Sequence, residues 1–298
     1  MRGIGSHLIA LACWVSLPLG ASAQCAAHRD YRTTENSGII VTDATITGTT
    51  SLNSDELASI ARASIGTCLD ESPDDLSDFV KSLFQDRGYY RAKVNRLELK
   101  PGDPLAHPKP VVIAADVLEG SRYTLTQIRF IGNHAFTDAQ LRSAFPTKNG
   151  EFFQRGKIAE GLDKLRELYV SDGFLDFATI VDDQALSDST VVLTLKTTEG
   201  AQYHLGKLEI FAPTDLADKL RAQWHLPEGA VFNRSYLLDY VRANHALLPA
   251  SFVPQDMQVV RDCPNATVEV RILVDPILAA SHPASRDVEC EKTQAGSP

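Results

Sequence analysis

The chain carries one pattern twice, and this repeat constrains its fold more than any other feature. Residues 117–133 (VLEGSRYTLTQIRFIGN) return as residues 198–213 (TEGAQYHLGKLEIFAP), with the Glu-Gly pair and the following tyrosine both displaced by 80 positions. Such a fixed interval is typical of tandem copies of one folding unit. In each copy, turn residues precede alternating apolar residues, which predicts a turn that leads into a half-buried strand.

The order of elements in one unit is clearest between residues 120 and 199. After the repeated strand, Thr137 followed by Gln140 is a capping-box pattern, which predicts a short helix. Alternating residues near the end of the unit predict strands at 175–181 and 191–195. Between the short helix and these strands, apolar residues at helical spacing predict a second helix through Ile158, Leu162, Leu165 and Tyr169. The order is therefore β-α-α-β-β.

The same order is predicted before and after this unit. The first unit has strand patterns at 38–50, 92–99 and 111–117 and helix starts at Asn53 and Pro73. The third unit has helix patterns at 214–224 and 233–248 and strand patterns at 257–261 and 268–274. We therefore expect six segments: a signal peptide (1–23), an N-terminal tail (24–37), three domains (38–119, 120–199 and a divergent 200–275), and a polar C-terminal tail (276–298).

The beginning of the chain has the pattern of a secretory signal. An apolar run at 8–19 and small residues at 21–23 predict cleavage before Gln24. A retained anchor helix is the alternative, but about twelve apolar residues are few for crossing a bilayer. Gln24 also argues against lipid attachment at Cys25, because a small residue usually precedes a lipidated cysteine. We expect no transmembrane span after cleavage.

Export determines how the cysteines are interpreted. Four of the five lie outside the signal, an even number that can pair in three ways in an oxidising compartment. Each half of the chain holds two of them, so we expect local disulfides, Cys25 with Cys68 and Cys263 with Cys290. Unpaired thiols are the alternative. A metal site is not predicted, because no Cys-x-x-Cys pair or histidine cluster accompanies them.

The sequence contains no pattern that favours catalysis or nucleic-acid binding. The net charge of −9 leaves no basic stripe. Zinc-hydrolase, nucleophile-elbow and phosphate-loop patterns are absent, and we expect no cofactor. The adjacent acids Asp74-Asp75 and Asp182-Asp183 fall in a predicted helix start and a predicted loop, where carboxylates are usually solvated or cap a helix. Glu119 and Glu199 are interpreted as turn residues.

The middle unit contains a distinctive set of residues: the Glu-Gly-x-x-Tyr start, Gly132-Asn133, Phe136, Leu141, Gly150, Phe153, Tyr169 and Asp172-Gly173-Phe174. With them the unit resembles the POTRA (polypeptide-transport-associated) domain of outer-membrane β-barrel assembly and two-partner secretion proteins. The first unit is similar through Gly48, Leu57 and Arg87-Gly88-Tyr89. The third departs, since residues 248–252 replace the glycine and aromatic pair and Ala212-Pro213 replaces Gly-Asn.

The resemblance implies an α+β fold in which two helices cover one face of a three-stranded mixed sheet. It also implies that the second strand of each unit lies at a sheet edge, where backbone groups can pair with an extended peptide. The candidate edge strands are 92–99, 175–181 and 257–261. The candidate binding residues are Val94, Leu97, Phe177, Thr179, Val181 and Val259. Short edges that bind nothing are the alternative.

The expected partners follow from the same resemblance. Relatives carry a membrane barrel after these domains, whereas the 23 residues after Asp275 are polar, so we expect a chain without a barrel. The partners would be proteins or unfolded outer-membrane protein segments, and a separate membrane β-barrel protein is a further candidate. The expected location is the periplasm, and a peripheral position at the outer membrane is one option there. A passive scaffold is the alternative function, and an enzyme with an unrecognised site is a remote one.

Overall fold

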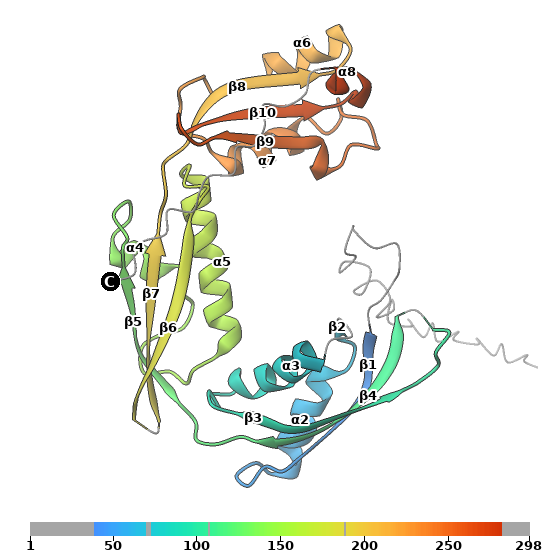
Figure 1. Ribbon diagram of the computed structural model, residues 1–298, viewed down its shortest axis with the longest axis vertical. Helices are drawn as coiled ribbons and strands as arrows, with labels where there is room; N and C mark the ends of the chain where they lie inside the picture. The colour runs from blue at the N-terminus through green and yellow to red at the C-terminus, as the bar shows by residue number, and fades with distance from the viewer. Residues whose placement is uncertain (1–38, 70–72, 107, 188, 282–298) are drawn as a thin grey trace, which may run out of the picture. The chain divides into compact units, whose positions relative to one another are not determined.

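The computed structural model describes residues 39–69, 73–106, 108–187 and 189–281 (Figure 1). The chain divides into two compact units. The first comprises Met1–Tyr123 and Phe153–Arg155, and the second comprises Thr124–Phe152 and Gly156–Pro298. One sheet lies in the first unit and two lie in the second, and they are called the first, middle and third sheets below.

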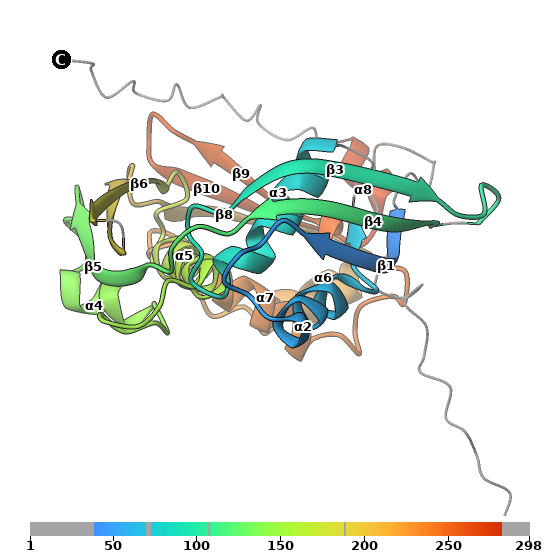
Figure 2. The same ribbon diagram turned by 90° about the horizontal axis from the view of Figure 1, so that it is seen from below.

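The first sheet has the strand order β2-β1-β4-β3. The strand β1 runs parallel to β4, and the other pairs are antiparallel. Two helices lie on the same face of this sheet (Figure 2). The first of them is capped by Asn53, the predicted helix start, which forms a capping box with Glu56. The elements are β1 (Ile39–Thr47), α2 (Ser54–Ser64), β2 (Cys68–Leu69), α3 (Pro73–Gln85), β3 (Lys93–Pro101) and β4 (Lys109–Leu118).

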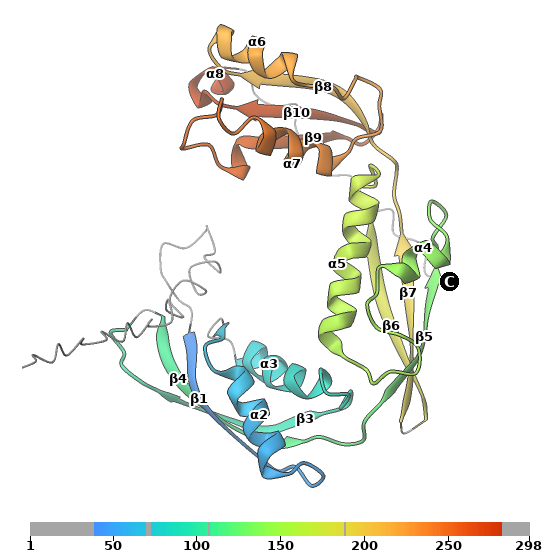
Figure 3. The same cartoon turned by 180° about the vertical axis from the view of Figure 1, so that it is seen from behind.

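The middle sheet has the order β5-β7-β6, with β5 parallel and β6 antiparallel to the central β7. Thr137 and Gln140 form the expected capping box at the first helix. The longer helix runs alongside the sheet (Figure 3), and its buried residues Ile158, Leu165 and Tyr169 face the core. The elements are β5 (Thr124–Ile131), α4 (Asp138–Ser143), α5 (Arg155–Ser171), β6 (Ala178–Ser187) and β7 (Thr190–Thr198).

The third sheet repeats this arrangement in the order β8-β10-β9. Its core contains the buried residues Leu205, Leu220, Phe232 and Val270. The segment predicted as a polar tail begins with a short helix. Asp275 caps this helix, because its side chain accepts hydrogen bonds from the N–H groups of Ile277 and Leu278. The elements are β8 (His204–Phe211), α6 (Thr214–Ala222), α7 (Arg234–Ala243), η2 (Pro254–Asp256), β9 (Met257–Asp262), β10 (Thr267–Leu273) and α8 (Pro276–Ala280).

The predicted α+β class, the β-α-α-β-β order and the edge position of each second strand are confirmed. The first sheet differs by the additional two-residue strand β2. The three sheets lie within the three predicted domain ranges, and the boundaries of those domains stay a prediction. The predicted signal peptide (1–23) and N-terminal tail (24–37) lie outside the described residues.

The predicted bounds of the strand at 175–181 were wrong. The strand β6 begins at Ala178 and extends to Ser187, so Asp182 and Asp183 lie in a strand and not in a loop. Acidic residues have low strand propensity, but the ladder with β7 pairs Asp182 with Thr194 and Asp183 with Leu193. Tertiary pairing therefore overrides the local preference.

Candidate functional site: the open sheet edges

In the first sheet, the free side of β1 is partly covered by the connection between the two helices. Ile39 pairs with Leu69 and Ile40 with Cys68 across the β1–β2 ladder. Val41 extends the contact, since its N–H donates to the Thr67 carbonyl at 3.1 Å. The start of β1 therefore has neighbours on both sides and is not open to another chain.

In the middle sheet, the connection between α4 and α5 covers the start of β5 in the same way. The Leu125 N–H donates to the Glu151 carbonyl at 2.9 Å, and the Gly150 N–H donates to the Leu125 carbonyl at 2.8 Å. Thr124 and Phe152 form an antiparallel bridge beside them. The start of β5 therefore has hydrogen-bonding neighbours on both sides.

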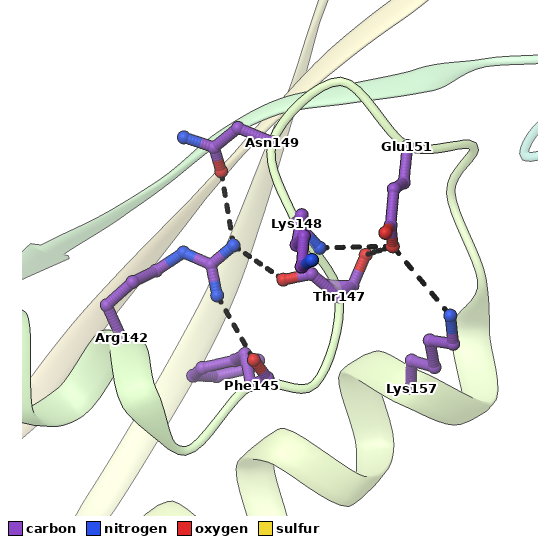
Figure 4. A network of polar contacts seen from close by, with 7 residues as sticks. All are labelled: Arg142, Phe145, Thr147, Lys148, Asn149, Glu151 and Lys157. Carbon is purple, nitrogen blue, oxygen red and sulfur yellow. Dashed lines mark hydrogen bonds and ion pairs between the residues drawn. The ribbon is translucent and has the colours of Figure 1, made fainter.

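Two charged residues fix the conformation of this connection (Figure 4). The Arg142 guanidinium donates to the carbonyls of Phe145 at 3.2 Å and Thr147 at 2.6 Å, and to the Asn149 side chain at 3.2 Å. The Glu151 carboxylate accepts from the Lys148 N–H at 3.1 Å and lies 3.7 Å from Lys157 Nζ. The Lys148 N–H, together with the positive charge of Lys157, lowers the pKa of Glu151. The cover over β5 is thus held by its own side-chain contacts.

The third sheet shows the same feature at β8. The Leu205 N–H donates to the Ala230 carbonyl at 2.8 Å, and the Gly229 N–H donates to the Leu205 carbonyl at 2.6 Å. His204 and Val231 form the corresponding bridge. In all three sheets, then, the connection between the two helices pairs with the start of the first strand and covers its outer side. Within the part of the chain that the structure describes, the second strands β3, β6 and β9 have a strand neighbour on one side only.

Along β3, several features discourage pairing with another strand. Val94 and Leu97 are three residues apart and would face opposite sides of a regular strand. The register shift between Val94 and Arg96 allows both to lie half-buried against the core. Arg96 and Glu98 form an ion pair at the surface, and Pro101 ends the strand. A bulge, charges and a proline are devices by which proteins blunt sheet edges.

The strand β9 is short and partly engaged. It has six residues, and Val259 packs against the core of the third sheet. The Arg261 guanidinium forms an ion pair with the carboxylate of Asp176, which also accepts a hydrogen bond from the Tyr203 hydroxyl at 2.7 Å. These contacts attach one end of β9 to the segment that precedes β6.

The strand β6 is the longest and most regular of the three edges. It has ten residues and keeps one register with β7 from Ala178 to Ala185. Thr179 is half-buried, and its hydroxyl lies 3.4 Å from the Lys196 carbonyl oxygen. Val181 is 37% exposed, and Ile180, which the sequence did not single out, is 70% exposed. A long, regular edge with exposed apolar residues is a site where another chain can pair.

One candidate residue lies outside this edge. Phe177 precedes β6 by one position, is 8% exposed, and stacks on Tyr169 with 4.2 Å between ring centroids. Its ring therefore belongs to the core and not to the strand. Phe174, by contrast, is half-buried, with its centroid 5.8 Å from that of Tyr169.

The repeated glutamates have a structural role that spacing alone did not reveal. Glu119 Oε1 accepts hydrogen bonds from the N–H groups of Thr50 at 2.8 Å and Ser51 at 2.7 Å. Glu199 Oε1 accepts from the N–H groups of His134 at 2.8 Å and Ala135 at 3.0 Å. Each carboxylate, just after the last strand of its sheet, thus holds the loop that follows the first strand. The Glu-Gly repeat was the signal, but its partners are 64 to 69 residues away.

The remaining predicted sites concern metals and disulfides. The described residues contain no group of three or more side chains that could hold a metal ion. Cys68 lies in β2, and Cys263 follows β9 with its sulfur 3.2 Å from the Tyr203 hydroxyl. The expected partners Cys25 and Cys290 lie outside the described residues, so the pairing stays a prediction. In the same described part of the chain, no helix has the length and hydrophobicity to cross a bilayer.

Comparison with known proteins agrees with this architecture. The family model POTRA, described as "Surface antigen variable number repeat", matches residues 123–200. Residues 123–200 of this chain form a POTRA domain. A crystal structure of Haemophilus influenzae BamA POTRA3-5 superposes on this chain with a TM-score of 0.56 at 18% identity, covering 78% of this chain and 95% of that one. At this identity, the match shows the fold alone.

Two curated relatives of this chain are named outer membrane protein assembly factor BamA. The protein from Neorickettsia risticii (strain Illinois) is 25% identical over 193 residues, which cover 58% of this chain and 26% of the relative. The protein from Neisseria meningitidis serogroup B (strain ATCC BAA-335 / MC58) is 26% identical over 140 residues, which cover 43% of this chain and 17% of the relative. The matched region therefore spans about a quarter or less of each relative.

Proposed function

We propose that this protein binds extended segments of other proteins during outer-membrane or envelope protein assembly, through the open edge of β6. The observation that carries the proposal is the recurrent covering of the first strands, which leaves the second strands as edges. Among these, β6 is the longest, keeps one register over eight residues and exposes Ile180. Main-chain hydrogen bonds at such an edge give affinity, and the side chains along the edge give specificity.

The biological setting of the proposal comes from the relatives, whose names refer to outer membrane protein assembly. Proteins of that setting would be the clients of this chain: unfolded outer-membrane protein segments, or a separate membrane β-barrel protein. The location would be the periplasm, at or near the outer membrane. The role is binding and not catalysis.

A passive scaffold is the second candidate, and one observation favours it. Asp176 joins Arg261 and Tyr203, so that side chains before β6 and along β9 are linked within the second unit. Ser171 and Ser235 add a hydrogen bond of 2.7 Å between α5 and the residues of α7. A protein whose only task is to set distances between partners would need such links and no open edge.

Proline substitution tests the binding edge, because proline removes one backbone donor. Consecutive strand residues direct their N–H groups to opposite sides, so Ile180→Pro and Val181→Pro form a matched pair. One of them breaks the ladder with β7 and should unfold the middle sheet. The other removes a donor from the open edge and should keep its far-ultraviolet circular dichroism while losing affinity for an extended peptide. Val259→Pro and Thr179→Pro extend the series.

The measurement is fluorescence anisotropy of a labelled, blocked peptide titrated with the full chain. The proposal requires that the folded member of the proline pair binds at least tenfold more weakly than the parent. Unchanged binding by that variant would exclude β6 as the binding edge. Loss of peptide binding only in Val259→Pro would identify β9 as the binding edge. A parent that binds no extended peptide would favour the scaffold.

A further inference from the structure

The side chains of β6 change from apolar to acidic at the same point on both faces of the strand. Ile180 pairs with Lys196 and Val181 pairs with Leu195. Since Leu195 is fully buried and Lys196 is exposed, Val181 lies on the helix-covered face and Ile180 lies on the open face. Of the next two residues, Asp182 lies on the same face as Ile180, and Asp183 lies on the same face as Val181.

These side chains are accessible on the strand. Ile180 is 70% exposed and Val181 is 37% exposed. Asp182 and Asp183 are both exposed. The Asp182 carboxylate lies 3.0 Å from Lys196 Nζ, with more than half of each side chain in solvent. An ion pair in this environment contributes little to stability and leaves the carboxylate able to accept a second cation.

On the open face of the middle sheet, a second exposed isoleucine lies near Ile180. Lys196 lies between Ile180 on β6 and Ile131 on β5 in the ladder registers. Ile131 is 53% exposed, so two isoleucines flank the lysine across the sheet. A strand that pairs with β6 would place one side chain next to Ile180 and, two residues along, another next to Asp182. Directly opposite side chains in paired strands interact, favourably for apolar or opposite-charge pairs and unfavourably for like charges.

We propose that the edge of β6 selects extended segments in which two successive apolar residues adjoin two successive basic residues. This rests on the proposed function and adds the chemical class of the partner. The apolar pair lies beside Ile180 and Val181, and the basic pair lies beside Asp182 and Asp183. In an antiparallel partner, the order from N to C is basic-basic-apolar-apolar, and in a parallel partner it is reversed.

The same acids argue against a second copy of this chain as the partner. An antiparallel pair of β6 strands centred on Asp182 and Asp183 would bring four carboxylates together, two from each copy. Like charges directly opposite each other destabilise strand pairing. Charged residues on an edge are a common means of preventing self-association. The pattern therefore admits a basic partner and disfavours an acidic one.

Two blocked, fluorescent peptides test this selectivity, TTKKVITT and its acidic counterpart TTEEVITT. With the full parent chain at low ionic strength, the lysine peptide should bind about tenfold more tightly than the glutamate peptide, since two charge pairs change sign. In the double variant Asp182→Asn/Asp183→Asn, the ratio should fall to about twofold or less, because both carboxylates are neutralised.

A matched control separates local from overall charge. Asp218→Asn/Asp239→Asn changes the net charge by the same amount, and both residues are exposed members of helical ion pairs in the third sheet region. This control should keep the preference of the parent. Circular dichroism confirms that the variants are folded.

The outcomes distinguish selectivity from edge binding. Loss of the preference in Asp182→Asn/Asp183→Asn alone supports the proposal. Equal binding of the two peptides by the parent overturns the selectivity and leaves the proposed edge pairing standing. The proposal is overturned if the parent and Asp182→Asn/Asp183→Asn show the same preference for the lysine peptide. It is also overturned if the control variant loses this preference to the same extent. Binding of neither peptide overturns both proposals.

Discussion

Replacing Glu119 with glutamine should weaken the first domain in a pH-dependent way. The side chain is 1% exposed, and its Oε1 accepts hydrogen bonds from the backbone N–H and the hydroxyl of both Thr50 and Ser51. Hydrogen bonds to a carboxylate are roughly twice as strong as those to a neutral amide oxygen. We therefore expect Glu119→Gln to lower the free energy of unfolding by about 2 kcal/mol at neutral pH.

The pH dependence follows from the pKa of this carboxyl group. Burial by itself raises the pKa of Glu119, but the hydrogen bonds from Ser51 and Thr50 outweigh burial and lower the pKa from 4.5 to about 2. The unfolded chain therefore binds the proton more readily than the folded chain. The resulting stabilisation, at most about 3 kcal/mol, is complete above the unfolded pKa and is lost as the pH falls from there through the folded pKa.

The assay is urea unfolding of the full parent and Glu119→Gln chains between neutral pH and pH 2, followed by circular dichroism. Hydrogen exchange at the amides of Thr50 and Ser51 gives the local readout. The difference in unfolding free energy between parent and variant should shrink as the pH falls, and exchange at both amides should accelerate in the variant. The exposed Glu228, replaced by glutamine, is the control. A difference that stays constant over this pH range would refute the argument.

Three further outcomes are expected. Phe177→Ala should lower the free energy of unfolding by about 3–5 kcal/mol in urea titrations, whereas Phe174→Ala should cost less because its ring is half-buried; equal losses would contradict this. Gly132→Ala should lower the melting temperature, because the residue has a φ of +83° and the added methyl would meet the Thr197 carbonyl oxygen. Peptide mapping without reduction should find two local disulfides; free thiols or a bridge between the halves of the chain would contradict the pairing.

Local patterns in the sequence were enough to predict the repeated architecture. The interval of 80 residues identified the units, and helix periodicity and capping residues placed most helices near their observed starts. At the starts of α2 and α4, Asn53 with Glu56 and Thr137 with Gln140 form capping boxes, in which the side chain of each residue bonds the backbone N–H of the other. These features depend on residues a few positions apart, so no knowledge of the tertiary structure was needed.

The extent of the edge strand was decided by tertiary pairing. Nothing local favours a strand through Asp182 and Asp183, and the sequence placed them in a loop. The ladder with β7 supplies their hydrogen-bonding partners and continues to Ser187. The same ladder excludes Phe177, which is drawn into the core by its contact with Tyr169.

The choice between the two edges of each sheet was likewise decided by long-range contacts. The hydrogen bonds of Leu125 with Gly150 and Glu151 cover β5, yet the partners lie about 25 residues apart and follow no period. The carboxylates of Glu119 and Glu199 reach loops even farther away along the chain. Periodicity reports which face of an element is buried, whereas hydrogen bonds between distant segments depend on where the folded chain brings them together.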